Sequence, residues 1–125
     1  MDRAELMAKY PGYRWVVERG LVGWAPFTEL QPWYFLPEEE MFDATERWPI
    51  GPSDAPLLVF ARRQDCDDLA CFRQGVGNTS EVVEVEGWSQ GGNSYDIIRL
   101  FPTFWEWLKS VIDDIADWSA LTGRE

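Results

Sequence analysis

The sequence predicts an α+β fold: one domain over residues 1–125, in which a mostly antiparallel sheet packs against an N-terminal helix and a long C-terminal helix. Short β-prone runs separated by glycine and asparagine turns fill residues 56–100. A helical apolar stripe begins at Phe104. A chain of 125 residues suits a single domain. A helix packed on an antiparallel sheet is the simplest arrangement that buries these apolar faces.

The N-terminal part predicts one short helix over residues 13–19, with Tyr13, Val16 and Val17 on one side. Gly20 follows this segment, and glycine readily adopts the left-handed conformation that ends a helix. We therefore expect the helix to end there and to lead into a loop marked by Pro26 and Pro32.

Residues 33–36 form a short run rich in aromatic residues and predict a strand. Pro37 keeps Leu36 extended, because a residue before proline avoids the helical conformation. Pro37 can also begin a helix, and the three glutamates that follow it would be favoured by the helix dipole. We expect this helix to extend to Arg47.

Four further strands are predicted at residues 56–61, 68–73, 81–86 and 95–100, with turns at 74–78 and 90–93. The first is continuously apolar, which is typical of a central strand covered on both faces. The third alternates: Val83 and Val85 should face the core, whereas Glu84 and Glu86 should face water or a partner.

The C-terminal helix has the clearest local signal. Thr103 and Glu106 have the spacing of a capping box, in which the threonine oxygen accepts from the amide of Glu106. Asp113, Asp114 and Asp117 lie off the apolar stripe and should face solvent. The stripe consists of Phe104, Trp107, Leu108, Val111, Ile112 and Ile115, extended by Trp118.

The charge balance points to a protein partner. The chain has 22 acidic and 11 basic residues, a formal net charge of −11. This excess disfavours binding to nucleic acid and to anionic membranes. It favours a basic protein, because complementary charge speeds encounter. The alternative is that the acidic residues only keep the protein soluble.

The absence of histidine excludes the common catalytic arrangements. Ser–His and Cys–His pairs, imidazole proton shuttles and histidine zinc sites are all impossible. No phosphate-binding glycine motif or nucleophile elbow occurs either, so we expect no cofactor and no enzyme activity. Cys66 and Cys71 form no disulfide framework, and Cys71 is expected in the core. The absence of a signal-like apolar stretch in residues 1–5 favours a cytoplasmic location.

The densest acidic group contains Asp65, Asp67 and Asp68. A calcium loop needs about six oxygen ligands and usually a glycine, so a metal site is disfavoured. A solvated turn and a docking surface for basic side chains both stay open. Trp88 follows an acidic strand and precedes a turn, so we expect it to be exposed. The other candidates for an aromatic recognition surface are Trp24, Trp33, Tyr34 and Trp48, of which about half should be core material.

From Pro56 onwards the chain resembles the SUKH superfamily, which includes bacterial immunity proteins and fungal cell-wall regulators. Three stretches carry the resemblance: residues 57–72 (LLVFARRQDCDDLACF), residues 82–88 (VVEVEGW) and residues 103–108 (TFWEWL), the last being similar to the family's Ser-Phe-x-x-Phe-Leu signature. The turn at residues 62–65 lacks the glycines that family members often have there. The resemblance implies an α+β domain without enzyme activity that binds a partner protein, often a toxin domain encoded nearby.

The leading hypothesis is therefore an immunity protein that neutralises a toxin domain, plausibly a basic nuclease-like one. The expected partner-binding residues are Asp65, Asp67, Asp68, Glu84, Glu86 and Trp88. A regulatory domain of the same fold without a toxin is the first alternative, and a toxin gene beside this one would argue against it. A hydrolase using paired carboxylates, with or without a metal ion, is the second alternative.

Overall fold

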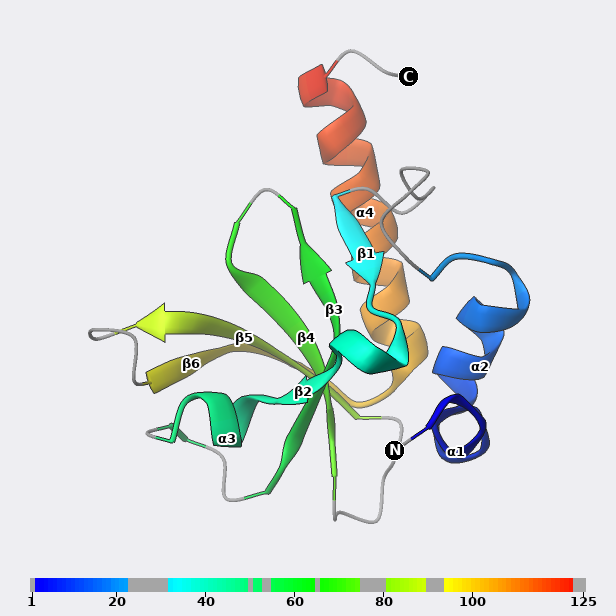
Figure 1. Ribbon diagram of the computed structural model, residues 1–125. Coiled ribbons are helices and arrows are strands. Elements are labelled where there is room, and N and C mark those ends of the chain that lie inside the picture. The colour runs from blue at the N-terminus through cyan, green and yellow to red at the C-terminus, as the bar shows by residue number, and fades with distance from the viewer. Residues whose placement is uncertain are drawn as a thin grey trace.

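The computed structural model describes residues 2–22, 32–49, 51–52, 55–64, 66–74, 81–89 and 94–122, apart from the side chains of residues 88–89 and 118–122. It confirms the predicted α+β fold class, with an antiparallel sheet, two N-terminal helices and a C-terminal helix (Figure 1). No helix in this part of the chain is long and apolar enough to cross a membrane. The elements are α1 (Arg3–Lys9), α2 (Pro11–Glu18), β1 (Trp33–Phe35), η1 (Glu38–Glu40), β2 (Phe42–Asp43), α3 (Ala44–Arg47), β3 (Leu57–Arg63), β4 (Asp68–Arg73), β5 (Val82–Ser89), β6 (Ser94–Phe101) and α4 (Phe104–Thr122).

The sheet has the strand order β1-β3-β4-β5-β6, and every neighbouring pair is antiparallel. The short strand β2 pairs with the first half of β3, and β1 pairs with its second half. The four strands predicted between residues 56 and 100 are confirmed as β3 to β6. β3 is covered on both faces, as its continuous apolar run predicted, because Leu57, Val59, Phe60 and Ala61 are all buried.

One face of the sheet packs against α1, α2 and α4 (Figure 1). Its centre is a group of aromatic rings in which Phe60 and Phe72 stack at 4.0 Å between centroids. Tyr10 stacks on the other side of Phe72 at 4.1 Å. Trp107 of α4 meets Phe60 edge-on at 5.1 Å, so the helix is held by ring contacts as well as by apolar burial.

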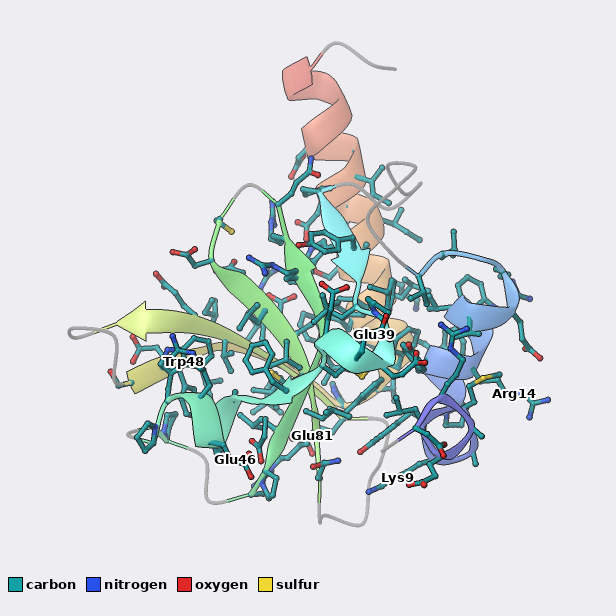
Figure 2. All side chains as sticks on the ribbon, in the orientation of Figure 1. Lys9, Arg14, Glu39, Glu46, Trp48 and Glu81 are labelled. Atoms are coloured by element: carbon teal, nitrogen blue, oxygen red, sulfur yellow. The ribbon has the colours of Figure 1, made fainter. Side chains whose placement is uncertain are left out.

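The opposite face is covered by the segment from Leu36 to Trp48 (Figure 2). A continuous helix from Pro37 to Arg47 was predicted there, and this prediction is wrong. Asp43 explains the break, because its carboxylate accepts from the amide of Thr45 at 2.8 Å and from the amide of Leu57 at 3.1 Å. It thereby caps a separate short helix, α3, and ties that helix to the start of β3. Trp48 then lies against Gly87 of β5.

The N-terminal region contains two helices where one was predicted. The missed helix, α1, begins at a cap in which Asp2 accepts from the amide of Glu5 at 2.9 Å. The predicted helix is confirmed as α2, which begins two residues earlier than expected, at Pro11. Gly20 has φ +66° and follows the end of α2, as predicted.

Helix α4 confirms the predicted cap and most of the predicted stripe. The Thr103 hydroxyl oxygen accepts from the amide of Glu106 at 3.2 Å. Phe104, Trp107 and Val111 are buried. Ile112 was expected in the stripe but is 56% exposed, because it lies on the outer flank of the helix, seven residues after the exposed Trp105.

The close approach of α2 to α4 at Gly12 gives a test of this packing. A Cβ at Gly12 would overlap the ring of Phe104, which is itself enclosed by other rings. Helix propensity alone would favour Gly12→Ala by about 1 kcal/mol. We expect the overlap to win and to lower the free energy of unfolding by about 1–3 kcal/mol in urea denaturation. Gly20→Asn is the control: no atom lies near its Cβ and asparagine tolerates its φ, so little change is expected. A Gly12→Ala variant as stable as the wild type would contradict the packing.

Candidate functional site

The α4-facing side of the sheet changes in character along its strands. Three rows of directly opposed residues cross β4, β5 and β6 on this side, and they pass from apolar to mixed to acidic. The rows are Phe72, Val82 and Phe101; Ala70, Glu84 and Arg99; and Asp68, Glu86 and Asp96. The candidate site lies where this gradient ends, at the acidic row.

Glu84, in the middle row, was expected to face water or a partner, and this expectation is wrong. Its side chain is fully buried beneath α4. One carboxylate oxygen, Oε2, accepts from the indole Nε1 of Trp107 at 3.0 Å. The other, Oε1, lies 2.9 Å from Arg99 Nη2 as an ion pair, although no aligned hydrogen bond reaches it. The alternation of β5 was predicted correctly, but α4 covers the face that carries this glutamate.

The environment of Glu84 favours its protonated form. Burial raises the pKa of this carboxyl above its ordinary value, because a desolvated carboxylate loses its hydration. The Arg99 guanidinium and the Trp107 hydrogen bond oppose this rise in pKa, whereas Asp114 and Asp68 add to it. The carboxylates of Asp114 on α4 and Asp68 on β4 are therefore close enough to raise the pKa of Glu84 by charge repulsion.

Asp68, Glu86 and Asp96 form the floor of a surface that we call the acidic shelf. Asp68 lies directly opposite Glu86 across β4 and β5, and Glu86 lies directly opposite Asp96 across β5 and β6. Directly opposed side chains have Cβ atoms about 4.5–5.5 Å apart, at which distance like charges are destabilising. Glu86 and Asp96 are exposed, and Asp68 is half-buried. The fold thus keeps three carboxylates in a row at a cost in stability.

Helix α4 provides the wall of the acidic shelf. Asp114 was expected to face solvent, but it accepts from Trp33 Nε1 at 2.8 Å and lies 3.4 Å from Arg63 Nη1. These contacts hold the second half of α4 over β1 and β3, away from β5 and β6. The flank that carries Trp105 packs on Trp15 of α2. By helix geometry the opposite flank, toward the shelf, carries Glu106, Ser110, Asp113 and Asp117.

The structure brings together only some of the predicted partner-binding residues. Asp68 and Glu86 lie in the shelf, whereas the exposed Asp67 precedes β4 in the chain and lines a pocket. Asp65 and the side chain of Trp88 fall outside the described residues. Asp96 and the acidic flank of α4 were not singled out from the sequence. The acids of α4 outnumber its one lysine, which was a signal in the sequence. Strand β6 has one acid and one base, so only the strand register shows that Asp96 joins the row of Glu86.

The predicted aromatic surface is mostly core where it is described. Trp33 and Trp48 are buried, and Tyr34 is half-buried. Trp24 lies outside the described residues. Cys71 is buried, as predicted, and burial raises the pKa of its thiol. The described aromatic residues therefore hold the fold together more than they form a recognition surface.

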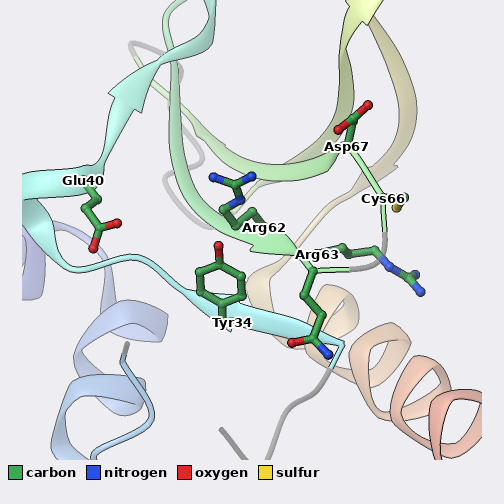
Figure 3. Close-up of a pocket in the computed structure, with 7 residues that line it drawn as sticks. Tyr34, Glu40, Arg62, Arg63, Cys66 and Asp67 are labelled. Atoms are coloured by element: carbon green, nitrogen blue, oxygen red, sulfur yellow. The ribbon is translucent and has the colours of Figure 1, made fainter. Parts of the chain in front are cut away.

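A pocket of about 620 Å³ lies on the opposite side of the sheet, beside the β3–β4 turn (Figure 3). Arg62 points across it above the ring of Tyr34, with Glu40 and Asp67 at opposite ends. Burial raises the pKa of Tyr34, although Arg62 counteracts this rise. A second hollow of about 230 Å³, which Trp48 lines, shares Arg62 and Asp67 with this pocket.

This pocket is poorly suited to the chemistry considered above. Its two carboxylates lie apart rather than facing each other, whereas glycoside hydrolysis needs a facing pair. Cys66 lines the pocket, but a chain without histidine offers that thiol no imidazole base. Across the described part of the chain, no three cysteine or acidic side chains are placed to hold a metal ion. The acidic shelf is therefore the better candidate site.

Comparison with protein-family models, with curated proteins and with solved structures finds no match to this chain. Its function has to be inferred from the site itself.

The raised pKa of Glu84 predicts a pH-dependent contribution to stability. Between the ordinary glutamate pKa near 4.5 and the raised value, the folded state binds more protons than the unfolded state. The contribution of Glu84 is thus fully present below the ordinary pKa and is lost as pH rises through that window. We expect the free energy of unfolding of the wild type to fall with rising pH relative to Glu84→Gln, which keeps an acceptor for Trp107. Urea denaturation at pH values from about 4 upwards measures this, and parallel pH profiles would contradict it.

Proposed function

We propose that this protein is a non-catalytic binding domain whose acidic shelf holds a basic surface of a partner protein. The observation that carries the proposal is the directly opposed row of Asp68, Glu86 and Asp96. Such a row lowers stability in the free protein. A partner that places arginine or lysine side chains over the row would turn this repulsion into attraction.

The surroundings of the row support the same conclusion. Two cations on the α4-facing side of the sheet already have acidic partners, since Arg99 pairs with Glu84 and Arg63 pairs with Asp114. The wall formed by α4 adds the carboxylates of Glu106, Asp113 and Asp117, with Lys109 as the one cation beside them in the described helix. Because the whole chain has a net charge of −11, this surface would attract a basic protein from a distance and raise the rate of association.

Within this class, we infer an immunity protein that blocks a toxin domain, such as a basic nuclease-like one. The resemblance of residues 57–72, 82–88 and 103–108 to the SUKH superfamily supports this narrower step. An acidic surface suits a toxin that binds nucleic acid, because the toxin's own substrate site is basic. The same proposal places the protein in the cytoplasm, where its two cysteines would stay reduced.

A regulatory domain of the same fold could use the shelf for a partner that is not a toxin. Gene order separates these two possibilities, because a toxin gene immediately upstream supports immunity. Co-expression of the two genes, with a pull-down and a growth-rescue assay, tests the immunity proposal directly. The proposal fails if the chain neither binds the neighbouring gene product nor restores growth.

Neutralising the shelf should weaken partner binding while stabilising the free protein. For Asp68→Asn/Glu86→Gln we expect an association rate constant about tenfold lower at low salt, with a shallower salt dependence. Removing the opposed charges should also raise the free energy of unfolding by about 0.2–1 kcal/mol. Stopped-flow binding to the captured partner and urea denaturation measure the two effects.

The matched control is Glu39→Gln/Glu46→Gln, which removes the same charge from η1 and α3, where both side chains are exposed (Figure 2). This variant should lower the association rate far less than the shelf variant. Equal rate losses in the two variants would mean that net charge rather than the shelf attracts the partner.

A further inference from the structure

Strand β6 forms an edge of the sheet, because among the described strands it pairs only with β5. The described residues expose five large hydrophobic side chains, and three of them lie on this strand. They are Ile97, Ile98 and Leu100, which are 36%, 41% and 56% exposed. An edge strand with exposed apolar side chains is suited to pairing with another strand.

The register of β6 changes at its centre. Arg99 lies opposite Glu84 and Ile97 lies opposite Val85, so Ile98 is an extra residue in a β-bulge. Asp96 and Arg99 are three positions apart, so a regular strand would place them on opposite sides of the sheet. The bulge restores Arg99 to the side that Asp96 faces. The α4-facing side of this edge therefore carries one acidic and one basic side chain, placed on either side of the two isoleucines.

We propose that β6 pairs antiparallel with β6 of a second copy of this chain, about a two-fold axis between Ile97 and Ile98. This register places Asp96 opposite Arg99 of the second copy and Ile97 opposite Ile98 of the second copy. A two-fold contact requires a surface that is complementary to itself. The order Asp-Ile-Ile-Arg meets that requirement, since its charges are opposite in sign and equidistant from the axis.

The state of Arg99 in the single chain fits this pairing. Its guanidinium lies 2.9 Å from the buried Glu84 carboxylate, yet its side chain is 46% exposed at the open edge. Asp96 of a second copy would meet this exposed side. Arg99 of the second copy would give Asp96 a cationic partner, and this attraction would offset the repulsion between Asp96 and the directly opposed Glu86. The pairing thus relieves a repulsion that the single chain contains.

A second copy fits this edge better than a strand of a basic partner. A basic strand would meet Arg99 as well as Asp96, whereas the second copy offers the opposite charge at both positions. The net charge of −11 on each copy opposes association. Charges more than about 8 Å apart are largely screened at physiological salt, so the local pairs at the seam dominate. The dimer engages Asp96 of the acidic shelf, whereas the other two floor residues, Asp68 on β4 and Glu86 on β5, stay open to a basic partner.

Sedimentation equilibrium of the purified chain at physiological salt tests the proposal over a range of protein concentrations. We expect the wild type to show a monomer–dimer equilibrium. Leu100→Lys places an exposed charge on the edge and should raise the dissociation constant of the dimer about tenfold or more. Asp96→Arg should have a similar effect, because it would face Arg99 of the second copy.

Two controls distinguish this seam from other contacts. Ile112→Lys changes a side chain that is also 56% exposed but lies on α4, so the dimer should persist. Asp68→Arg inverts a charge on β4, two strands away from β6 and not opposite Asp96, and the dimer should again persist. The proposal is overturned if the wild type stays monomeric at all concentrations. It is also overturned if a dimer survives both Leu100→Lys and Asp96→Arg, with circular dichroism confirming that the variants fold.

Discussion

The buried contact between Glu84 and Trp107 determines how α4 lies on the sheet. Burying a carboxylate is expensive unless it is paired and hydrogen-bonded, so Glu84 requires both the indole of Trp107 and the guanidinium of Arg99. These three residues belong to α4, β5 and β6. The contact therefore fixes the helix at one point along the sheet, which the less directional ring contacts around Phe60 could not do alone.

A second carboxylate, on the helix itself, sets the direction in which α4 leaves that point. Asp114 binds the indole of Trp33 and pairs with Arg63, so the second half of α4 lies over β1 and β3. The acidic ends of β4, β5 and β6 are consequently left uncovered. Glu84 and Asp114 thus separate the α4-facing side of the sheet into a closed apolar part and an open acidic part.

The sequence was sufficient for the elements that depend on local rules. Strand alternation, the cap at Thr103 and the glycine after α2 were all predicted, because each depends on residues close together in the chain. The burial of Glu84 and Asp114 was not predicted, since it depends on which face α4 covers. The same limit applies to Asp43, which bonds to Leu57, fourteen residues away. The acidic shelf was predicted in part, because pairing register decides which of the many acids become neighbours.

The arrangement of acids also supports the proposal of binding rather than catalysis. Acid–base chemistry needs carboxylates that converge on one point with pKa values set apart. Here Asp68, Glu86 and Asp96 lie side by side along a row, and Glu84, whose pKa is raised by burial, is sealed beneath α4. Three carboxylates in a row spread their negative charge along the sheet, so that several arginine or lysine side chains of a partner can contact it at once. Such a row suits a macromolecular surface better than a small substrate, and it lies on three directly paired strands of one sheet.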